Sequence, residues 1–239
     1  MPLEPRQHAG LGLPAQPDYR WCAGLNAVYV SAAEFGRAMH DYPIALARVP
    51  HSGEFQPVAI MGLRSGQNLF VDAQGRWRDD AYVPAYCRRY PFCIAEIPGE
   101  DHVDAPRRLV CVSPDGLTRD TPAPLFGADG SPNSAWKALH GLIERVEAAR
   151  MQTRVLCRRL EALDLLRPFD ALALPRKGPQ QRLHGIYRVD EDRLSALPAR
   201  QLRALMSKGE LRAIYAHLLS LENFARLLDR ATAHATASG

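Results

Sequence analysis

The chain has 239 residues, of which 46% are hydrophobic and 23% are charged, so its composition is that of a globular protein and excludes wholesale disorder. Thirty Lys and Arg residues against 26 Asp and Glu residues give a net charge of +4 at pH 7, too small a surplus to indicate a nucleic-acid partner. No apolar run approaches the ~20 residues that a transmembrane helix needs, and residues 1–17 lack the apolar core of a secretory signal. The five cysteines form no C-x-x-C pair, so we expect reduced thiols in a cytoplasmic protein, without disulfides or structural zinc.

The first half of the chain is predicted to be a mobile arm followed by closely spaced strands. Residues 1–17 are rich in proline and polar side chains, which indicates a mobile N-terminal arm. Residues 32–40 have helical character, and turn residues separate the other segments. The predicted strands are 25–31, 42–49, 56–62, 68–72, 92–97 and 108–113. Strands joined by turns rather than by helices indicate an antiparallel sheet.

The second half is predicted to be rich in helices. Ser131 as N-cap and Pro132 at the first helical position begin a long helix, which Arg167-Pro168 should end at about residue 166. Two strands (169–174 and 182–189) and two helices (192–207 and 211–231) follow. The fold class is therefore α+β: one domain over 18–239, with a strand-rich part (18–130) and a helix-rich part (131–239). Its mainly antiparallel sheet would be covered by the long helix and a C-terminal helix pair.

The long helix carries an apolar heptad stripe with two possible roles. The stripe consists of Leu139, Leu142, Val146, Ala149, Thr153, Leu156, Leu160 and Leu163. A seam of this kind can join two chains, so a homodimer through the 139–163 face is one interpretation. Packing against the chain's own sheet is favoured, because Ala149 and Thr153 weaken the middle of the stripe. The opposite face has a row of arginines, typical of a solvated surface or of a site for an acidic partner: Arg145, Arg150, Arg154, Arg158 and Arg159.

Aromatic and arginine side chains gather between residues 77 and 92. They are Trp77, Tyr82, Tyr86, Arg88, Arg89, Tyr90 and Phe92. On a short helix between Pro84 and Pro91, the three tyrosines would share one face because they are spaced by four residues. The composition is typical of a binding platform for a peptide, a carboxylate or a phosphate. The alternative is a structural cluster in which the aromatic side chains pack on the sheet and the arginines pair with nearby carboxylates.

Other motifs support weaker hypotheses. His102 and Asp104 have the H-x-D spacing of a non-haem iron site, with His140 or His184 as the distal histidine. Cys87 lies beside two arginines, yet no histidine and acid that would serve nucleophilic catalysis are identifiable near it. The last two predicted helices imitate a helix-turn-helix. The second is too apolar to read DNA, and its His217 is predicted to be a core histidine.

Two groups of residues resemble the bacterial SapC family. The first runs from Asn68-Leu69-Phe70-Val71-Asp72 through Gly75, Trp77 and Tyr82-Val83-Pro84-Ala85 to Arg88-Arg89-Tyr90-Pro91-Phe92. The second comprises residues 185–191 and 214–221, so the likeness extends from about residue 18 to 228. The resemblance implies an accessory protein, associated with export of surface-layer protein or with outer-membrane receptors and flavin- or iron-dependent modifying enzymes. It carries over no catalytic residues.

The residues and the resemblance together favour a non-enzymatic, cytoplasmic accessory or adaptor protein without a cofactor. It would bind a protein or peptide partner, linked to export or modification of cell-surface proteins, through the 77–92 region. The alternative is an iron-dependent oxygenase that uses His102, Asp104 and His184 as metal ligands. A structural subunit of a surface layer is disfavoured, because no signal peptide is visible.

Overall fold

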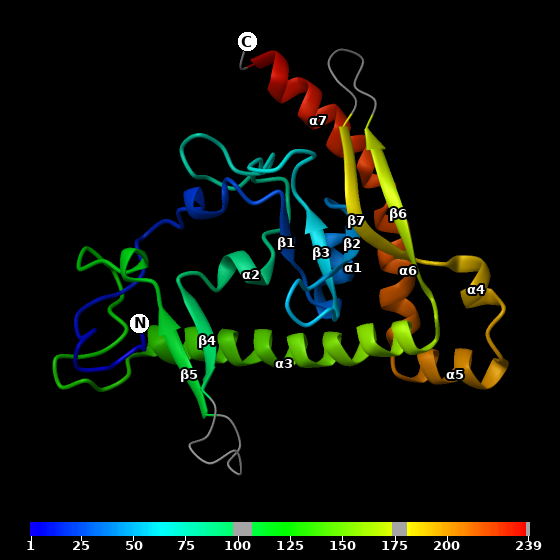
Figure 1. Ribbon diagram of the computed structural model, residues 1–239. Helices are drawn as coiled ribbons and strands as arrows, with labels where there is room; N and C mark the ends of the chain where they lie inside the picture. Colours follow the sequence, from blue (N-terminus) through cyan, green and yellow to red (C-terminus); the bar gives the residue numbers. More distant parts are fainter. Residues whose placement is uncertain (98–106, 174–180, 238–239) are drawn as a thin grey trace. The chain divides into compact units, whose positions relative to one another are not determined.

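The computed structural model of the protein describes residues 1–97, 107–173 and 181–237 (Figure 1). The chain forms two compact units, where a single domain over 18–239 is predicted from the sequence. The first unit comprises Met1–Asp18 and Tyr86–Ala148, and the second comprises Tyr19–Ala85 and Ala149–Gly239. The fold class is α+β, with antiparallel sheets, one long helix and a group of C-terminal helices.

The first unit is built around the antiparallel pair β4 (Phe92–Ile97) and β5 (Arg107–Val112), followed by the short η3 (Pro114–Gly116). The first half of α3 (Ser134–Ala162) completes it. Its hydrophobic core consists of Phe92, Val112, Leu125, Phe126, Leu139 and Ile143. Trp136 packs on this core, with its ring centroid 5.9 Å from that of Phe92 and 5.3 Å from that of Phe126.

Residues 1–17 are part of the first unit, which differs from the mobile arm predicted from their proline content. The Leu3 N–H donates to the Val110 carbonyl, and the Val112 N–H donates to the Met1 carbonyl, both at 2.8 Å. Leu3 and Leu13 pack against the core. Proline removes only its own N–H, so the residues between the prolines remain able to pair with a strand.

The second unit contains a five-stranded antiparallel sheet in the order β1-β3-β2-β7-β6. The strands are β1 (Ala27–Tyr29), β2 (Ile44–Arg48), β3 (Phe55–Ile60), β6 (Leu166–Ala173) and β7 (Gln181–Val189). β2 pairs with β7, placing Leu46 opposite Tyr187. Strands from both halves of the sequence therefore share one sheet, so the predicted separation into a strand-rich and a helix-rich part does not describe the sheet.

Both sequence stretches of the second unit contribute helices that pack with this sheet. The early ones are η1 (Arg20–Cys22), η2 (Ala32–Glu34) and α1 (Phe35–Ala38). The late ones are the second half of α3, α4 (Glu191–Ser195), α5 (Ala199–Ser207), α6 (Glu210–Ser220) and α7 (Asn223–Ala237). α6 contacts β2 and β7, and α7 contacts β6 (Figure 1). The core therefore lies between the sheet and α1, α3 and α6, with Ile44, Leu160 and Ile214 fully buried.

The long helix differs from its prediction at both ends. It begins at Ser134, because the Ser131 hydroxyl donates to the Asp129 carboxylate at 2.7 Å instead of capping the helix. It ends at Ala162, four residues early. Asp164 adopts a positive φ of 53°, and the Leu165 N–H donates to the Leu160 carbonyl at 3.0 Å. This is a left-handed helix terminus formed without glycine, so its sequence signal is weak.

Three other predicted elements are wrong in detail. The helix predicted over 192–207 is interrupted at Pro198, which lacks an N–H and disfavours helix at the residue before it. The helix predicted over 211–231 is broken between α6 and α7, where Asn223 Nδ2 donates to the Met39 carbonyl at 2.7 Å. The strand predicted over 68–72 is absent. Instead, Asn68 Nδ2 donates to the Cys22 carbonyl at 3.1 Å, and its Oδ1 accepts from the Phe70 N–H at 3.0 Å.

Candidate functional site

The residues predicted to form one binding platform are divided between the two units. Trp77 and Tyr82 belong to the second unit, whereas Tyr86, Arg88, Arg89, Tyr90 and Phe92 belong to the first. The helix expected to align the three tyrosines on one face is wrong, because α2 covers only Ala85–Arg88. Tyr82 and Tyr90 lie outside it, so helical spacing does not relate their side chains.

Trp77 is a core residue of the second unit. Its indole Nε1 donates to the Tyr42 hydroxyl at 3.2 Å, and its ring stacks on Phe70 at 6.4 Å between centroids. The Tyr42 hydroxyl in turn donates to the Tyr82 carbonyl. Trp77 is only 6% exposed, so it orders the core and offers no surface to a partner.

Tyr82 completes a shell of donors around a buried carboxylate. Its hydroxyl donates to Glu34 Oε1 at 3.0 Å, and the Ala85 N–H donates to the same oxygen at 2.6 Å. The Ser31 N–H and hydroxyl donate to Glu34 Oε2 at 3.0 and 2.7 Å. Four donors compensate the loss of water around this carboxylate, which gives Tyr82 a structural role.

Arg89 is held within the first unit by two contacts. Its Nη1 lies 3.2 Å from Glu147 Oε1, and its guanidinium lies over the Tyr86 ring at 5.2 Å from the centroid. The Arg89 side chain is 18% exposed and the Glu147 side chain 6%. Phe92 is buried, Tyr86 and Tyr90 are half-buried, and Arg88 is exposed. Arg88 is therefore the most accessible of the predicted platform residues.

The predicted metal ligands are not assembled in the described part of the chain. His102 and Asp104 lie outside the described residues. His184 is exposed, and its Nδ1 lies 3.0 Å from Asp170 Oδ1, while His140 lies 3.7 Å from Glu144. Among the residues that the structure describes, no group of three or more His, Cys, Asp or Glu side chains could hold a metal ion.

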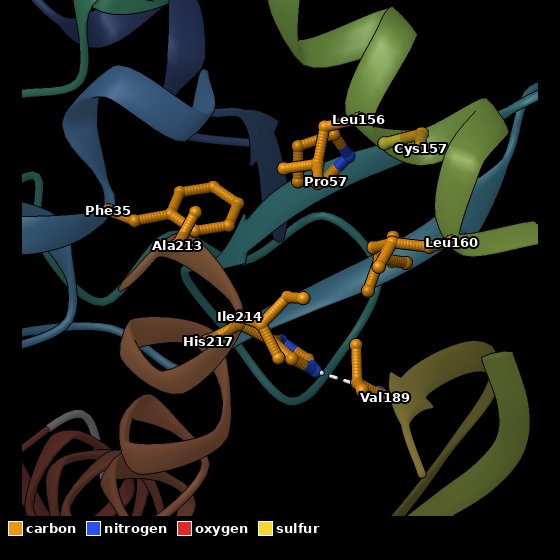
Figure 2. Close-up of a pocket in the computed structure, with 10 residues that line it drawn as sticks. Phe35, Pro57, Leu156, Cys157, Leu160, Val189, Ala213, Ile214 and His217 are labelled. Atoms are coloured by element: carbon orange, nitrogen blue, oxygen red, sulfur yellow. Dashed lines mark hydrogen bonds between the residues drawn. The ribbon is translucent and has the colours of Figure 1, made fainter. Parts of the chain in front are cut away.

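A small apolar cavity of about 10 Å³ lies in the second unit. Figure 2 shows residues that line it, among them Leu156 and Leu160 of α3 and Ile214 and His217 of α6. His217 Nδ1 donates to the Ile44 carbonyl at 2.7 Å, and Nε2 accepts from the Val189 N–H at 3.1 Å. Both ring nitrogens are therefore satisfied in the neutral form, and burial lowers the pKa of His217 to about 4. The cavity has room for about one water, so it is a packing void around the predicted core histidine.

One face of α6 is exposed. Arg212, Tyr215 and Leu219 are spaced by three and four residues, so they share one helix face. We call this the α6 outer face. Tyr215 is 43% and Leu219 55% exposed, whereas Ile214 and His217 face the core. The signal was present in the sequence: α6 is apolar around more of its circumference than one buried stripe needs.

A hollow of about 340 Å³ lies beside α6. Leu218 of α6 lines it together with residues from β6, β7 and the start of α4. Its charged lining residues are Arg167, Arg188, Asp190, Glu191 and Asp192. Exposed apolar side chains beside a polar hollow of this kind are typical of protein contact surfaces.

A family model described as SapC matches residues 3–227, nearly the whole chain. The chain belongs to the SapC family. The match confirms the resemblance seen in the sequence and extends it into residues 3–17, which pack in the first unit. Several SapC-like residues that carried the resemblance, including Asn68, Trp77 and Phe92, are buried. Comparison of this SapC protein with curated proteins and with solved structures gave no match.

No helix in the described part of this SapC protein is both long enough and apolar enough to cross a membrane.

Proposed function

We propose that this SapC-family protein is a non-enzymatic accessory protein that binds a polypeptide partner through the α6 outer face. The observation that carries the proposal is the pair Tyr215 and Leu219, two large apolar side chains about half exposed on one face of a helix whose other side packs against the sheet. Leaving them in water costs roughly 25 cal/mol per Å² of apolar surface, so covering them favours association. Tyr is also among the residues that contribute most at protein interfaces.

Charge between residues 199 and 212 supports a partner of acidic character, whereas the charged lining of the hollow at Leu218 is mixed. Arg200, Arg203, Lys208 and Arg212 are exposed, and none has an ion-pair partner in the described part of the chain. Glu210 is the one acid between residues 199 and 212, and it is paired with Arg159 at 2.7 Å. The complement to this surface is a polypeptide segment with apolar anchors flanked by Asp and Glu, because opposite potentials favour encounter and register.

The proposed contact surface differs from the 77–92 region expected from the sequence because of burial. Trp77 and Phe92 are core residues, and Arg89 is paired with Glu147. Arg88 remains exposed and is kept as a second, independent position to test. The partner is expected among polypeptides linked to the export or modification of cell-surface proteins, as the SapC resemblance implies, and we place the encounter in the cytoplasm.

The test is quantitative capture of partners from the native cell lysate by tagged protein, followed by affinity measurement with the purified partner. Tyr215→Ser combined with Leu219→Ser should weaken binding at least tenfold and leave the thermal midpoint nearly unchanged, because both side chains are exposed. Met151→Ser combined with Val155→Ser is the matched control. Those residues are a similarly exposed apolar pair on α3.

The outcome distinguishes the candidate surfaces. Loss of binding in the α6 variant alone supports the proposal, and an acidic stretch in the captured partner supports the charge argument. Loss in the α3 variant, or in Arg88→Ala with the α6 variant unaffected, would place the contact elsewhere and contradict it.

A further inference from the structure

A second hollow, of about 300 Å³, lies in the second unit between α3 and the β2–β3 hairpin. Its volume is at the low end of the range typical of small-molecule pockets, roughly 300–1,000 Å³. Its wall combines apolar side chains, including Val49, Phe55 and Tyr29, with the charged Glu54 and Arg154. A ligand of matching chemistry therefore needs both an apolar body and a charged group.

Two arginines donate hydrogen bonds to one carboxylate at this hollow, and these three groups set its local charge. Arg154 Nε and Nη2 donate to the two oxygens of Glu54 at 2.8 and 2.9 Å. Arg158, one turn further along α3, donates to Glu54 Oε1 from Nε at 3.1 Å and from Nη2 at 2.6 Å. Both guanidiniums lower the pKa of Glu54, so this group is ionised and the trio carries a net charge of +1.

The two guanidiniums retain donors for a further anion. A guanidinium has five N–H groups in a planar fork, and each of these arginines uses two of them on Glu54. Arg150, one turn before Arg154, also lines the hollow. The trio of Arg154, Arg158 and Glu54 thus has one cationic group more than its carboxylate neutralises.

The rest of the wall adds no negative charge. Burial raises the pKa of the Tyr29 phenol and of the Cys157 thiol, each to about 12, so both remain neutral at physiological pH. The protonated thiol is also a poor nucleophile, so covalent chemistry at Cys157 is not expected. Phe55 is 5% exposed and its ring is covered by the Arg48 guanidinium at 4.1 Å from the centroid, so the half-buried Val49 is the more accessible apolar side chain of the wall.

We propose that this hollow binds a small organic anion whose carboxylate contacts Arg154 and whose apolar body rests against Val49. Glu54 acts as an internal competitor, because it occupies donors that the ligand carboxylate would otherwise use. This binding site is independent of the α6 outer face, so either proposal can fail without the other.

The test uses phenylacetate as probe, with benzyl alcohol as the neutral analogue and inorganic phosphate as an anion without an apolar body. Titrations of the full chain are followed by calorimetry and by amide shifts of residues 49–57 and 150–158. Phenylacetate should bind, and Arg154→Gln should weaken its binding about tenfold, the effect of losing one charge-assisted hydrogen bond. Arg145→Gln, an exposed arginine elsewhere on α3, is the matched control and should change nothing.

A second substitution, which should strengthen binding instead of weakening it, makes the test specific to this geometry. Glu54→Gln removes the internal competitor and should tighten phenylacetate binding several-fold. Weaker binding in Glu54→Gln, equal effects of Arg154→Gln and Arg145→Gln, or no saturable phenylacetate binding at millimolar concentration would each overturn the proposal. Equally tight binding of benzyl alcohol or of phosphate would overturn the requirement for both an apolar body and an anionic group.

Discussion

Arg89 forms a largely buried ion pair with Glu147 and therefore has a structural role. Two adjacent arginines at 88 and 89 suggest a binding pair, yet they have different environments. Arg89 is largely buried against Glu147 and Tyr86, whereas Arg88 reaches solvent. The sequence could not separate them, because the distinction depends on a carboxylate 58 residues further along the chain.

Single substitutions at these two positions should therefore separate stability from surface function. Arg89→Ala should lower the free energy of unfolding by about 3 kcal/mol, because it leaves the buried Glu147 carboxylate without this guanidinium. Arg88→Ala should change it by less than about 0.5 kcal/mol. Chemical denaturation of both variants is the measurement, and equal effects would contradict the different roles assigned to them.

The buried, neutral His217 should make the folded protein less stable as the pH falls below 6.5. Its folded-state pKa of about 4 lies below its ordinary value of 6.5, so between these values the unfolded chain takes up a proton that the folded protein does not. The contribution of His217 is fully present above about pH 6.5 and is lost as the pH falls toward 4, by about 1.4 kcal/mol per pH unit.

The matched variant is His217→Gln, which keeps a donor and an acceptor and does not titrate. The stability difference between the natural protein and this variant should shrink from pH 6.5 to pH 4 by the amount expected for one group. A difference that stays constant over this range, measured by urea unfolding at several pH values, would show that His217 does not remain neutral in the fold.

Among the elements, those with a strong local pattern could be predicted and those set by distant contacts could not. β4 has the predicted bounds, and the ends of β2, β3 and β7 lie within two residues of prediction, because alternating or continuous apolar runs between turn residues specify them. The end of α3 depends on the left-handed backbone of Asp164, a residue that is not glycine. The break between α6 and α7 and the irregular segment at Asn68 depend on side chains that bond to remote backbone groups. Composition does not reveal such bonds.

The candidate sites divide in the same way. The cluster of aromatic residues at 77–92 was visible in the sequence, whereas the exposure of Tyr215 and Leu219 depends on which face of α6 packs against the sheet. The arginine row on α3 was also visible. Its convergence on Glu54 required the fold, because that residue lies 100 positions away from Arg154.

The heptad stripe of α3 should contribute to stability through its buried residues and not through their exposed neighbours. Leu156 is 5% exposed and packs inside the second unit, whereas its neighbour Val155 is exposed. Leu156→Ala should cost about 3 kcal/mol of unfolding free energy, and Val155→Ala less than about 0.5 kcal/mol. If Leu156→Ala kept its stability but altered the oligomeric state in analytical ultracentrifugation, the stripe would be a seam between chains instead.

For the whole molecule, the important feature is that each compact unit is assembled from two separate stretches of sequence. The first unit needs residues 1–18 beside β5, and the second joins strands from both halves in one sheet. Such pairing between distant segments leaves no local signal, so the sequence does not reveal that residues 1–17 pair with β5.

Deletion of residues 1–17 tests this arrangement. The truncated chain should lose the backbone hydrogen bonds that Met1 and Leu3 make to Val112 and Val110. It should also lose the packing of Leu3 and Leu13 against the core. Hydrogen exchange should then show lost protection of amides across 108–126, with the amides of β2 and β3 as the internal reference. Unchanged protection of 108–126 would show that residues 1–17 are a dispensable arm.

The central claim is that a polypeptide partner covers the α6 outer face, and site-specific photo-crosslinking in the native cell tests it most directly. A benzophenone amino acid at position 215 should form a covalent adduct with one defined polypeptide, identified by mass spectrometry. The same probe at the exposed position 151 should not form that adduct. Adduct formation at 151 and none at 215, or no polypeptide adduct at either position, would contradict the claim.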